Sequence, residues 1–374
     1  MTEPEQQQPP HFLEASLSDW QAAVKIAGKP KFKAKQIHDW IWKKRVFQPS
    51  DMSNLSLSDR DWLSTIANWS LPEVDQTLNS SDGTTKILLK GPKNQFYEAV
   101  IIRYENRITL CVSSQVGCKL ACSFCQTGKL GFFRHLTQGE ILGQFALAEQ
   151  IVKAENKRIT NVVFMGMGEP LDNYAAAIGA ANRLIEPEYF GLSARHVTIS
   201  TSGIATKIES MARETRASLA ISLHAANDQL RRELMPINQR YSLSVLKDAL
   251  LNYQNATGRK ITIEYILIQN KNCGPNHAKE LTEFLRGLRC KVNLIPFNAH
   301  PGLPYGRPDD ETIRSFQKHL ASRSIAAPVR YSRGGDVSAA CGQLAAKKED
   351  MLNHKPERKF ILGERKLTDV SPSP

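Results

Sequence analysis

Residues 108–128, ITLCVSSQVGCKLACSFCQTG, join a strand-like run to a loop that holds three cysteines. Cys118, Cys122 and Cys125 have the spacing C-x3-C-x2-C, so their thiolates can converge on one inorganic centre from a single loop. Barrels of alternating strands and helices keep their active sites at the carboxyl ends of the strands. The stretch therefore predicts a strand whose carboxyl end carries a catalytic metal centre.

The number of ligands separates the kinds of centre that this loop can hold. A structural zinc site needs a fourth ligand, usually from a second cysteine pair or a histidine pair. No second C-x2-C pair occurs in the chain, and His135 is the only histidine nearby. A cubane iron–sulfur cluster usually takes four cysteines, so three leave one iron open. Zinc, or three unrelated buried thiols, remain the alternatives.

Around this loop the chain alternates strand-like runs with helical patterns. The six strand-like runs cover residues 108–113, 159–165, 196–201, 217–223, 261–268 and 291–296. Helical patterns separate them, for example at residues 137–152 and 276–288. Six such units predict an α/β fold, a partial (β/α)6 barrel of the TIM type, because two strands of a complete barrel are missing.

The remaining sequence predicts three further segments. Residues 1–75 are helical, basic and tryptophan-rich after a disordered start at 1–12, and residues 76–104 form a β-hairpin linker or extension. The hairpin rests on strand-like runs at 85–90 and 96–103, which flank the turn sequence Gly-Pro-Lys-Asn. The core barrel then takes residues 105–345, and residues 346–374 form a basic tail.

The distribution of charge points to a polyanionic partner. The chain has 49 Lys and Arg against 37 Asp and Glu, a formal net charge of +12. Eight basic residues gather in the helical segment against the single acid Asp39: Lys25, Lys29, Lys31, Lys33, Lys35, Lys43, Lys44 and Arg45. Like charges repel unless an anion meets them, which favours contact with a nucleic-acid backbone. A solvated helix face around a small aromatic core is the alternative.

The cysteine count and the amino-terminal sequence predict a cytoplasmic protein without a membrane partner. Seven cysteines, three of them crowded together, do not resemble a disulfide scaffold and suit a reducing compartment. The start, MTEPEQQQPP, has neither the basic nor the apolar region of a signal peptide. No apolar run approaches the ~20 residues of a membrane span.

Polar or glycine motifs follow the later strands, as a site at one end of a barrel requires. Gly168 and Glu169 end the second strand; a glycine lets the backbone approach a ligand, and a carboxylate can bind an ammonium group. Taken singly, such residues are more often turns or helix caps. The candidates at the third, fourth and sixth strand ends are Ser200, Ser222, Leu223, His224 and Asn298.

Three further residues carry no clear role by pattern alone. Cys341 lies in a loop of small residues, where a thiol is either reactive or idle. Cys111 lies on the first strand and resembles an ordinary buried cysteine, while Glu98 resembles a solvent-facing strand residue. Cys273 and Cys290 match no role, so structural thiols are the default.

These motifs together resemble the radical S-adenosylmethionine (SAM) superfamily, and within it the RlmN family, dual-specificity adenine-C2 methyltransferases of ribosomal and transfer RNA. The resemblance covers nearly the whole chain and rests on GCKLACSFCQTG, FMGMGEP, SLHAAND and RGGDVSAACGQL. It implies a [4Fe–4S] cluster held by the three loop cysteines and two SAM molecules per turnover. The residues that it implies for SAM contact are the strand-end candidates Gly168, Glu169, Ser200, Ser222, Leu223, His224 and Asn298.

The resemblance also implies a reaction. C2 of adenine is an electron-poor carbon that cannot attack a methyl cation donor, so a radical route is needed. Cys341 would carry the methyl group, Glu98 would take the C2 proton, and Cys111 would release the product through a transient disulfide with Cys341. The implied substrates are 23S rRNA at the peptidyl transferase centre and transfer RNA beside the anticodon. An electron donor such as flavodoxin and a monomeric enzyme complete these expectations.

Three other functions remain open at this stage. The first is the sister enzyme, which methylates C8 of the same adenosine and confers antibiotic resistance; the large basic domain and the GMGEP motif favour C2. The second is a non-catalytic RNA-binding protein with a zinc or cluster site, which would not need Cys341, Glu98 or Glu169. The third is a radical SAM enzyme for a small molecule, against which the basic domain argues.

Overall fold

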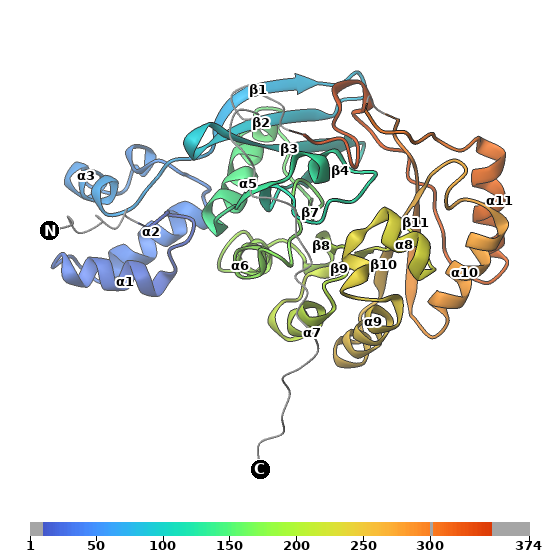
Figure 1. Ribbon diagram of the computed structural model, residues 1–374. Coiled ribbons are helices and arrows are strands. Elements are labelled where there is room, and N and C mark those ends of the chain that lie inside the picture. Colours follow the sequence, from blue (N-terminus) through green and yellow to red (C-terminus); the bar gives the residue numbers. More distant parts are fainter. Residues whose placement is uncertain (1–9, 300–301, 346–374) are drawn as a thin grey trace, which may run out of the picture.

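The computed structural model describes residues 10–299 and 302–345. Its centre is a nine-stranded sheet in the order β1-β2-β3-β4-β7-β8-β9-β10-β11 (Figure 1). The six strands from β4 onward run parallel to one another, whereas β1, β2 and β3 run antiparallel and extend the sheet beyond β4. The predicted tail at 346–374 and most of the predicted disordered start lie outside the described residues.

All six predicted strands of the barrel are confirmed. They are β4 (Arg107–Cys111), β7 (Asn161–Phe164), β8 (Val197–Thr201), β9 (Ser218–Ser222), β10 (Ile261–Leu267) and β11 (Cys290–Pro296). In the described part of the chain β1 and β11 are the two ends of the sheet, so the barrel is open. The predicted α/β class with a partial barrel is therefore confirmed.

Helices connect the parallel strands and run along the outside of the sheet (Figure 1). They are α5 (Gln138–Lys153), α6 (Tyr174–Ile185), α7 (Ala205–Glu214), α8 (Asp228–Leu234), α9 (Leu243–Thr257), α10 (Pro275–Leu285) and α11 (Asp310–Ala321). Local sequence fixes several of their ends. At the start of α5, the Thr137 hydroxyl accepts from the amide of Glu140, whose carboxylate accepts from the Thr137 amide, a capping box. Gly258 ends α9 in the left-handed conformation.

The predicted hairpin is present, but it is part of the main sheet. β2 (Thr85–Gly91) pairs with β3 (Gln95–Tyr104), and β3 pairs with β4 so that Val100 faces Cys111. Strand β1 (Glu73–Asn79), which lies mostly exposed at the edge of the sheet, was not predicted. A small second sheet of β5 (Gln115–Gly117) and β6 (Phe132–His135) was not predicted either. Between these two strands the chain forms the cysteine loop and then α4 (Gln126–Leu130).

The amino-terminal part is helical, as predicted, with α1 (Leu17–Ile26), α2 (Phe32–Trp42) and α3 (Leu57–Ile66). Short 3-10 turns complete the described elements at Pro49–Asp51, Pro92–Asn94, Ala194–His196, Pro236–Gln239 and Gly335–Val337. Aromatic rings form the core of this part: Phe12 stacks on Trp69 with ring centres 4.8 Å apart. Trp42 packs edge-on against Tyr189 and Phe190 of the barrel, which docks the helices to it.

The basic stretch of these helices is more neutralised than its sequence suggests. Lys29 and Lys33 both pair with Asp59 of α3, and Arg45 pairs with Glu149 of α5. The local sequence shows only Asp39 near the basic residues, because Asp59 and Glu149 lie 26 to 104 residues away in the chain from the residues they pair with. The expectation of eight mutually repelling charges was therefore wrong. For Lys25 and Lys31 no ion pair is found within the described residues, and both are exposed.

Candidate active site

The cysteine loop starts from the small sheet and is fixed by its backbone. Gly117 has a φ of 74° and lies against Gly131 so closely that any side chain would collide with the carbonyl oxygen of that residue. The amide of Cys118 then donates to the same carbonyl at 2.7 Å. A glycine is required here because the loop must turn back against its neighbour within a single residue.

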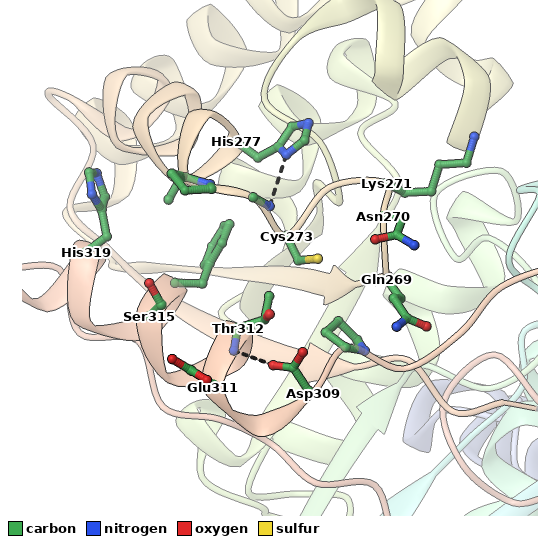
Figure 2. A pocket seen from close by; sticks show the side chains of 15 residues that line it. Gln269, Asn270, Lys271, Cys273, His277, Asp309, Glu311, Thr312, Ser315 and His319 are labelled. Atoms are coloured by element: carbon green, nitrogen blue, oxygen red, sulfur yellow. Dashed lines mark hydrogen bonds between the residues drawn. The ribbon is translucent and has the colours of Figure 1, made fainter.

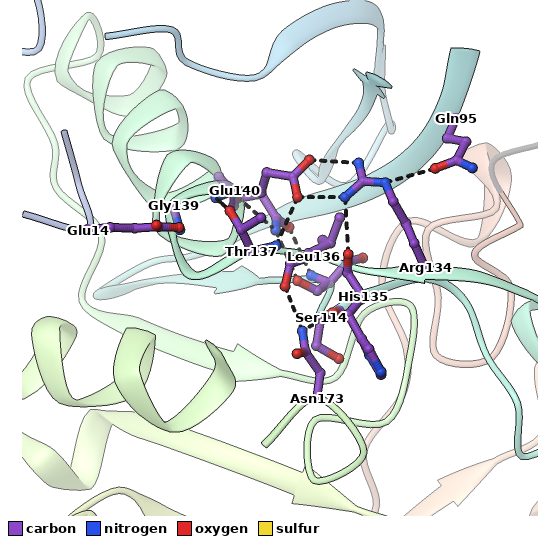
Figure 3. A network of polar contacts seen from close by, with 12 residues as sticks. Glu14, Gln95, Ser114, Arg134, His135, Leu136, Thr137, Gly139, Glu140 and Asn173 are labelled. Atoms are coloured by element: carbon purple, nitrogen blue, oxygen red, sulfur yellow. Dashed lines mark hydrogen bonds and ion pairs between the residues drawn. The ribbon is translucent and has the colours of Figure 1, made fainter. Parts of the chain in front are cut away.

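A polar network holds the base of this loop to the barrel (Figure 3). Asn173, ahead of α6, donates to the carbonyls of Ser114 at 2.8 Å and Leu136 at 2.7 Å, one on each side of the small sheet. Arg134 of β6 forms a two-fold ion pair with Glu140 of α5, with both distances 2.7 Å. The network ties β5, β6 and α5 together and so fixes the direction in which the cysteine loop leaves.

The three loop cysteines lie in one apolar environment. Cys118, Cys122 and Cys125 are half-buried and pack against a cluster that includes Leu120 and Phe124. Burial raises the pKa of Cys118 and Cys122, and the neighbouring thiols raise it further. Because the three thiols pack against one apolar cluster, a charged thiolate there would be stabilised by a metal centre that all three could bind.

The donor set fits an iron–sulfur cluster better than a single ion. Among the residues that the structure describes, no group of three or more His, Cys, Asp and Glu side chains is placed to hold one metal ion. A cubane cluster distributes its thiolate ligands over separate irons, so it needs three thiols around one hollow and not around one atom. That these cysteines are cluster ligands stays a prediction.

The glycine-and-glutamate motif lies next to this loop. Gly168 has a φ of 103°, and a Cβ there would stand 2.6 Å from the Cβ of Gln115. The buried Glu169 accepts from the amide and the hydroxyl of Ser202, each at 2.8 Å, and from the amide of Leu171 at 3.0 Å. Burial raises the pKa of Glu169, and its charge in turn raises the pKa of Cys118. The carboxylate is thus rigidly held beside the cysteine loop.

The candidates at the other strand ends also meet at this edge of the sheet. Ser200 and Leu223 are buried, whereas Ser222 and Asn298 are half-buried. His224 has a φ of 61° and packs edge-on against Phe124, with ring centres 4.8 Å apart. The end of β9 and the cysteine loop are therefore in direct contact. Whether these residues bind SAM stays a prediction.

His224 is a neutral histidine with a defined proton. Its Nδ1 accepts from the amide of Ile266 at 3.1 Å, so the ring proton is on Nε2. Burial, and secondly the charge of Arg231, lower the pKa of His224 to about 3. The Nε2–H group is therefore available as a donor throughout the neutral pH range.

The structure brings together the two cysteines that are 230 residues apart. Cys111 is buried at the end of β4, where burial, and secondly the charge of Cys341, raise its pKa to about 12. Cys341 is reached by solvent, yet the surrounding protein excludes enough water to raise its pKa to about 11. Glu264 and Cys125 raise the pKa of Cys341 further. All of these groups therefore lie within electrostatic reach of one another.

Glu98 differs from its expected exposure. It is only 4% exposed, so the interpretation as a solvent-facing strand residue was wrong. Its Oε1 lies 3.2 Å from Lys86 Nζ, and its Oε2 accepts from the amide of Ala345 at 3.1 Å. The pattern misled because the loop that carries Cys341 covers this face of the hairpin, which no local periodicity reveals. Glu98 thus faces the segment of Cys341.

Sequence reasoning also missed several polar residues of this region. Ser202, Arg231 and Glu264 are buried and contact or influence the predicted site residues, and Asn298 donates to Ser332, which lowers the pKa of Cys341. The signal that could have found Ser202 is its place two residues after Ser200 at the same strand end. Arg231 and Glu264 lie in helix and strand interiors, where the sequence offers no comparable signal.

Another cavity lies away from these residues (Figure 2). It has a volume of about 610 Å³ and is lined by the starts of α10 and α11, with Cys273, His277 and Asp309 among the residues around it. It contains none of the predicted site residues. In the described parts of the chain, no helix is long and apolar enough to cross a membrane.

Known proteins with similar sequences agree with this geometry. Residues 112–280 match the family model of the radical SAM superfamily, and residues 12–68 match that of the ribosomal RNA large subunit methyltransferase N-terminal domain. The dual-specificity RNA methyltransferase RlmN of Bdellovibrio bacteriovorus is 41% identical over 349 residues, covering 93% of this chain and 87% of that protein. The same enzyme of Syntrophus aciditrophicus is 43% identical over 338 residues, covering 90% and 97%.

A solved structure extends the similarity to the fold. The crystal structure of a radical SAM methyltransferase from Sphaerobacter thermophilus is 41% identical in sequence and superposes with a TM-score of 0.87. The match covers 91% of this chain and all of that chain (100%). The helical amino-terminal part, the extended sheet and the open barrel are thus common to both proteins.

The buried neutral His224 predicts a pH dependence of stability. Its pKa is about 3 when folded against 6.5 as the ordinary value, so between these values the unfolded chain binds the extra proton and stability falls as the pH falls. His224→Asn keeps an acceptor for the Ile266 amide and suits the positive φ. Denaturant unfolding between pH 4 and about pH 5.5 should give the variant a slope shallower by about 1.4 kcal/mol per pH unit, and the difference in slope should shrink toward pH 7. Parallel curves for both proteins would contradict the prediction.

Proposed function

This chain belongs to the RlmN family of radical SAM RNA methyltransferases, and we propose from that premise that it methylates C2 of adenosine in two kinds of RNA. The protein is an enzyme that uses SAM to methylate RNA. The proposed substrates are 23S rRNA at the peptidyl transferase centre and transfer RNA at the adenosine beside the anticodon. The observation that supports the proposal most is the convergence of Cys111, Cys341 and Glu98 at the edge of the sheet where the cysteine loop lies.

Membership of the superfamily implies a [4Fe–4S] cluster and SAM. We assign the cluster to Cys118, Cys122 and Cys125, whose shared apolar setting suits an inorganic centre with one open position. Held by these cysteines, such a cluster would supply the one electron needed to cleave SAM to a radical, and a low-potential donor such as flavodoxin would provide it. The fixed carboxylate of Glu169 suits the amino group of SAM, because it stays beside the cysteine loop while it accepts from Ser202.

Cys341 is proposed to carry the methyl group to the RNA. Its sulfur first takes a methyl group from one SAM molecule, and a second SAM molecule is used to activate that group, hence two per turnover. The solvent-reached position of Cys341 lets an RNA base approach it, which a buried thiol would not. Asn298 donates to Ser332, and Ser332 lowers the pKa of the Cys341 thiol, which favours the form of that sulfur that accepts a methyl group.

Glu98 and Cys111 are proposed to complete the reaction. Once the methyl carbon of Cys341 is bonded to C2, the carboxylate of Glu98 accepts the C2 proton; the Lys86 ion pair keeps that carboxylate facing the Cys341 segment. The adduct also gives up one electron, which the oxidised cluster would take back. The Cys111 thiolate then bonds to the Cys341 sulfur while the bond from that sulfur to the methyl carbon breaks; the electron pair of that bond stays on the carbon, which takes a proton and becomes the methyl group of the product. Because Cys111 is buried, no outside thiol replaces it easily.

The exposed lysines of the amino-terminal helices are proposed to contact the RNA backbone. Lys25 and Lys31 flank the turn between α1 and α2, beside the exposed ring of Phe32. Lysines without a carboxylate partner can meet phosphates without breaking an existing ion pair, unlike Lys29 and Lys33. The monomeric state and the cytoplasmic location stay predictions of the sequence.

The regiochemistry is tested on the product. Enzyme reconstituted without oxygen is incubated with SAM, a reductant and RNA from cells that lack the gene, and the modified nucleoside is identified by mass spectrometry. We expect 2-methyladenosine in both 23S rRNA and transfer RNA. The appearance of 8-methyladenosine would identify the sister activity, and the absence of methylation would contradict the proposed function.

Replacement of Cys341 and replacement of Cys111 should block the reaction at different steps. Cys341→Ala should yield no methylated RNA, because the methyl carrier is lost. Cys111→Ala should yield RNA that remains covalently attached to the protein, because the bond to sulfur cannot be broken; a denaturing gel with radiolabelled RNA detects the adduct. Cys290→Ala is the matched control and should behave as the wild type. Methylation by Cys341→Ala, or product release by Cys111→Ala at the wild-type rate, would contradict the assigned roles.

Charge reversal tests the RNA surface. The double variant Lys25→Glu and Lys31→Glu should bind RNA about tenfold more weakly and lower the slope of log K against log salt by about two. The double variant Lys279→Glu and Lys318→Glu changes the net charge equally on α10 and α11, at the other end of the molecule (Figure 1). An equal loss in both variants, measured by filter binding, would show that only the net charge matters.

A further inference from the structure

Arg231 is a buried positive charge that the proposed reaction does not use. It lies on α8 and is 0% exposed. A charge removed from water costs much free energy, and buried charges are therefore normally paired with groups of opposite charge. We therefore expect either a negatively charged partner near Arg231 or a function that requires an unpaired cation at this position.

The hydrogen-bond partners of Arg231 are all neutral. Its Nε donates to the Leu223 carbonyl at 3.2 Å, its Nη1 to the Asn238 side chain at 2.9 Å and its Nη2 to the Ser202 carbonyl at 2.6 Å. A longer contact reaches the Ser222 carbonyl at 3.5 Å. Among the residues that the structure describes, none offers Arg231 a carboxylate within the 4.0 Å of an ion pair. Each nitrogen of the guanidinium group has a hydrogen-bond acceptor, but no group of opposite charge forms an ion pair with it.

The end of α8 packs against the cysteine loop, because Leu234 and Met235 lie in the same apolar cluster as Cys118, Cys122 and Cys125. Cys122 acts on Arg231 more strongly than Asp228 does, and Arg231 acts on Cys122 in return. The backbone confirms the contact between the two segments, because the amide of Ser123 donates to the carbonyl of Leu234, at the end of α8, at 2.9 Å. The unpaired charge therefore lies beside a ligand predicted to hold the cluster.

We propose that Arg231 is the internal counter-ion of the iron–sulfur cluster and that its fixed charge raises the reduction potential of the cluster. The inference rests on the proposed function, in which Cys118, Cys122 and Cys125 hold that cluster. It adds a positioning residue that touches neither SAM nor RNA and acts only through the cluster.

The sign of the effect follows from the change in charge. One electron from the low-potential donor makes the cluster more negative by one unit, and no proton or ligand needs to be exchanged. A cation at fixed distance stabilises the reduced form more than the oxidised form, so reduction becomes easier. Arg231 keeps its charge at neutral pH, because burial lowers its pKa only to about 10.

A purely structural role is the alternative, since Arg231 also joins the ends of β8 and β9 through Ser202 and Leu223. Such a role would affect folding or cluster assembly without a specific change of potential. The chain contains a suitable comparison in Arg259, a partly buried arginine whose hydrogen-bond acceptors are likewise neutral oxygens, the backbone carbonyls of Ala212, Thr215 and Ala217. Arg259 precedes β10, at the opposite end of the strands from the cysteine loop.

The test compares Arg231→Gln, Arg231→Lys and Arg259→Gln with the wild-type enzyme, each reconstituted without oxygen. Iron and sulfide content report cluster assembly, and a redox titration followed by electron paramagnetic resonance gives the reduced fraction. At the potential that half-reduces the wild type, Arg231→Gln should show a ratio of reduced to oxidised cluster about tenfold lower, a shift of about 59 mV to more negative potential. Arg231→Lys and Arg259→Gln should stay within about twofold of the wild type.

Each result supports or overturns the inference. A wild-type potential in Arg231→Gln overturns it, and so does an equal shift in Arg231→Lys, because the charge is then not the cause. If Arg231→Gln does not fold, Arg231→Lys decides alone: an assembled cluster of nearly wild-type potential supports the inference, and a shifted potential or a lost cluster overturns it. A wild-type enzyme that assembles no cluster would contradict the proposed function itself.

Discussion

Parallel pairing of the strands from β4 to β11 is the constraint on which the site depends. In a parallel sheet all carboxyl ends lie at one edge, so residues from distant segments meet there. Cys111, Glu169, Ser202 and His224 each follow or end a different strand, and they lie close to the cysteine loop for this reason. Without this common edge, the three loop cysteines would lack the polar and charged residues from the strand ends that now surround them.

The antiparallel extension gives this site its second wall. β2 and β3 carry Lys86 and Glu98, which contact the segment from Ser338 to Ala345, so the loop of Cys341 is attached to the hairpin. The hairpin therefore forms one wall of the proposed reaction site and is not a mere spacer between the helices and the barrel. A rigid attachment would matter for Cys341 in its proposed role, because small displacements of reacting groups cost much of the rate.

The buried charged residues at this edge of the sheet differ in the groups that surround them. Glu169 is satisfied by amide and hydroxyl donors, Glu98 by a lysine, and Arg231 only by neutral oxygens beside Cys122. Groups held in this way keep their orientation without reorganisation during a reaction. The chain thus has an anionic group, Glu169, and a cationic group, Arg231, beside the cysteine loop; the proposals above assign the first to an ammonium group and the second to a negatively charged centre.

The sequence by itself determined the features that depend on neighbours in the chain: six strands, their helices, the cysteine spacing and the glycine-rich strand ends, because periodicity and turn residues act locally. Only the tertiary structure decided the pairing of Lys29 and Lys33 with Asp59, the burial of Glu98 and the approach of Cys111 to Cys341. Strand β1 was missed because its burial pattern has no clear alternation. The ion pairs, the burial of Glu98 and the approach of the two cysteines depend on contacts between residues far apart in the chain. Those contacts follow from the order of the strands and from the segments that cover the sheet, and neither can be recognised in the local sequence.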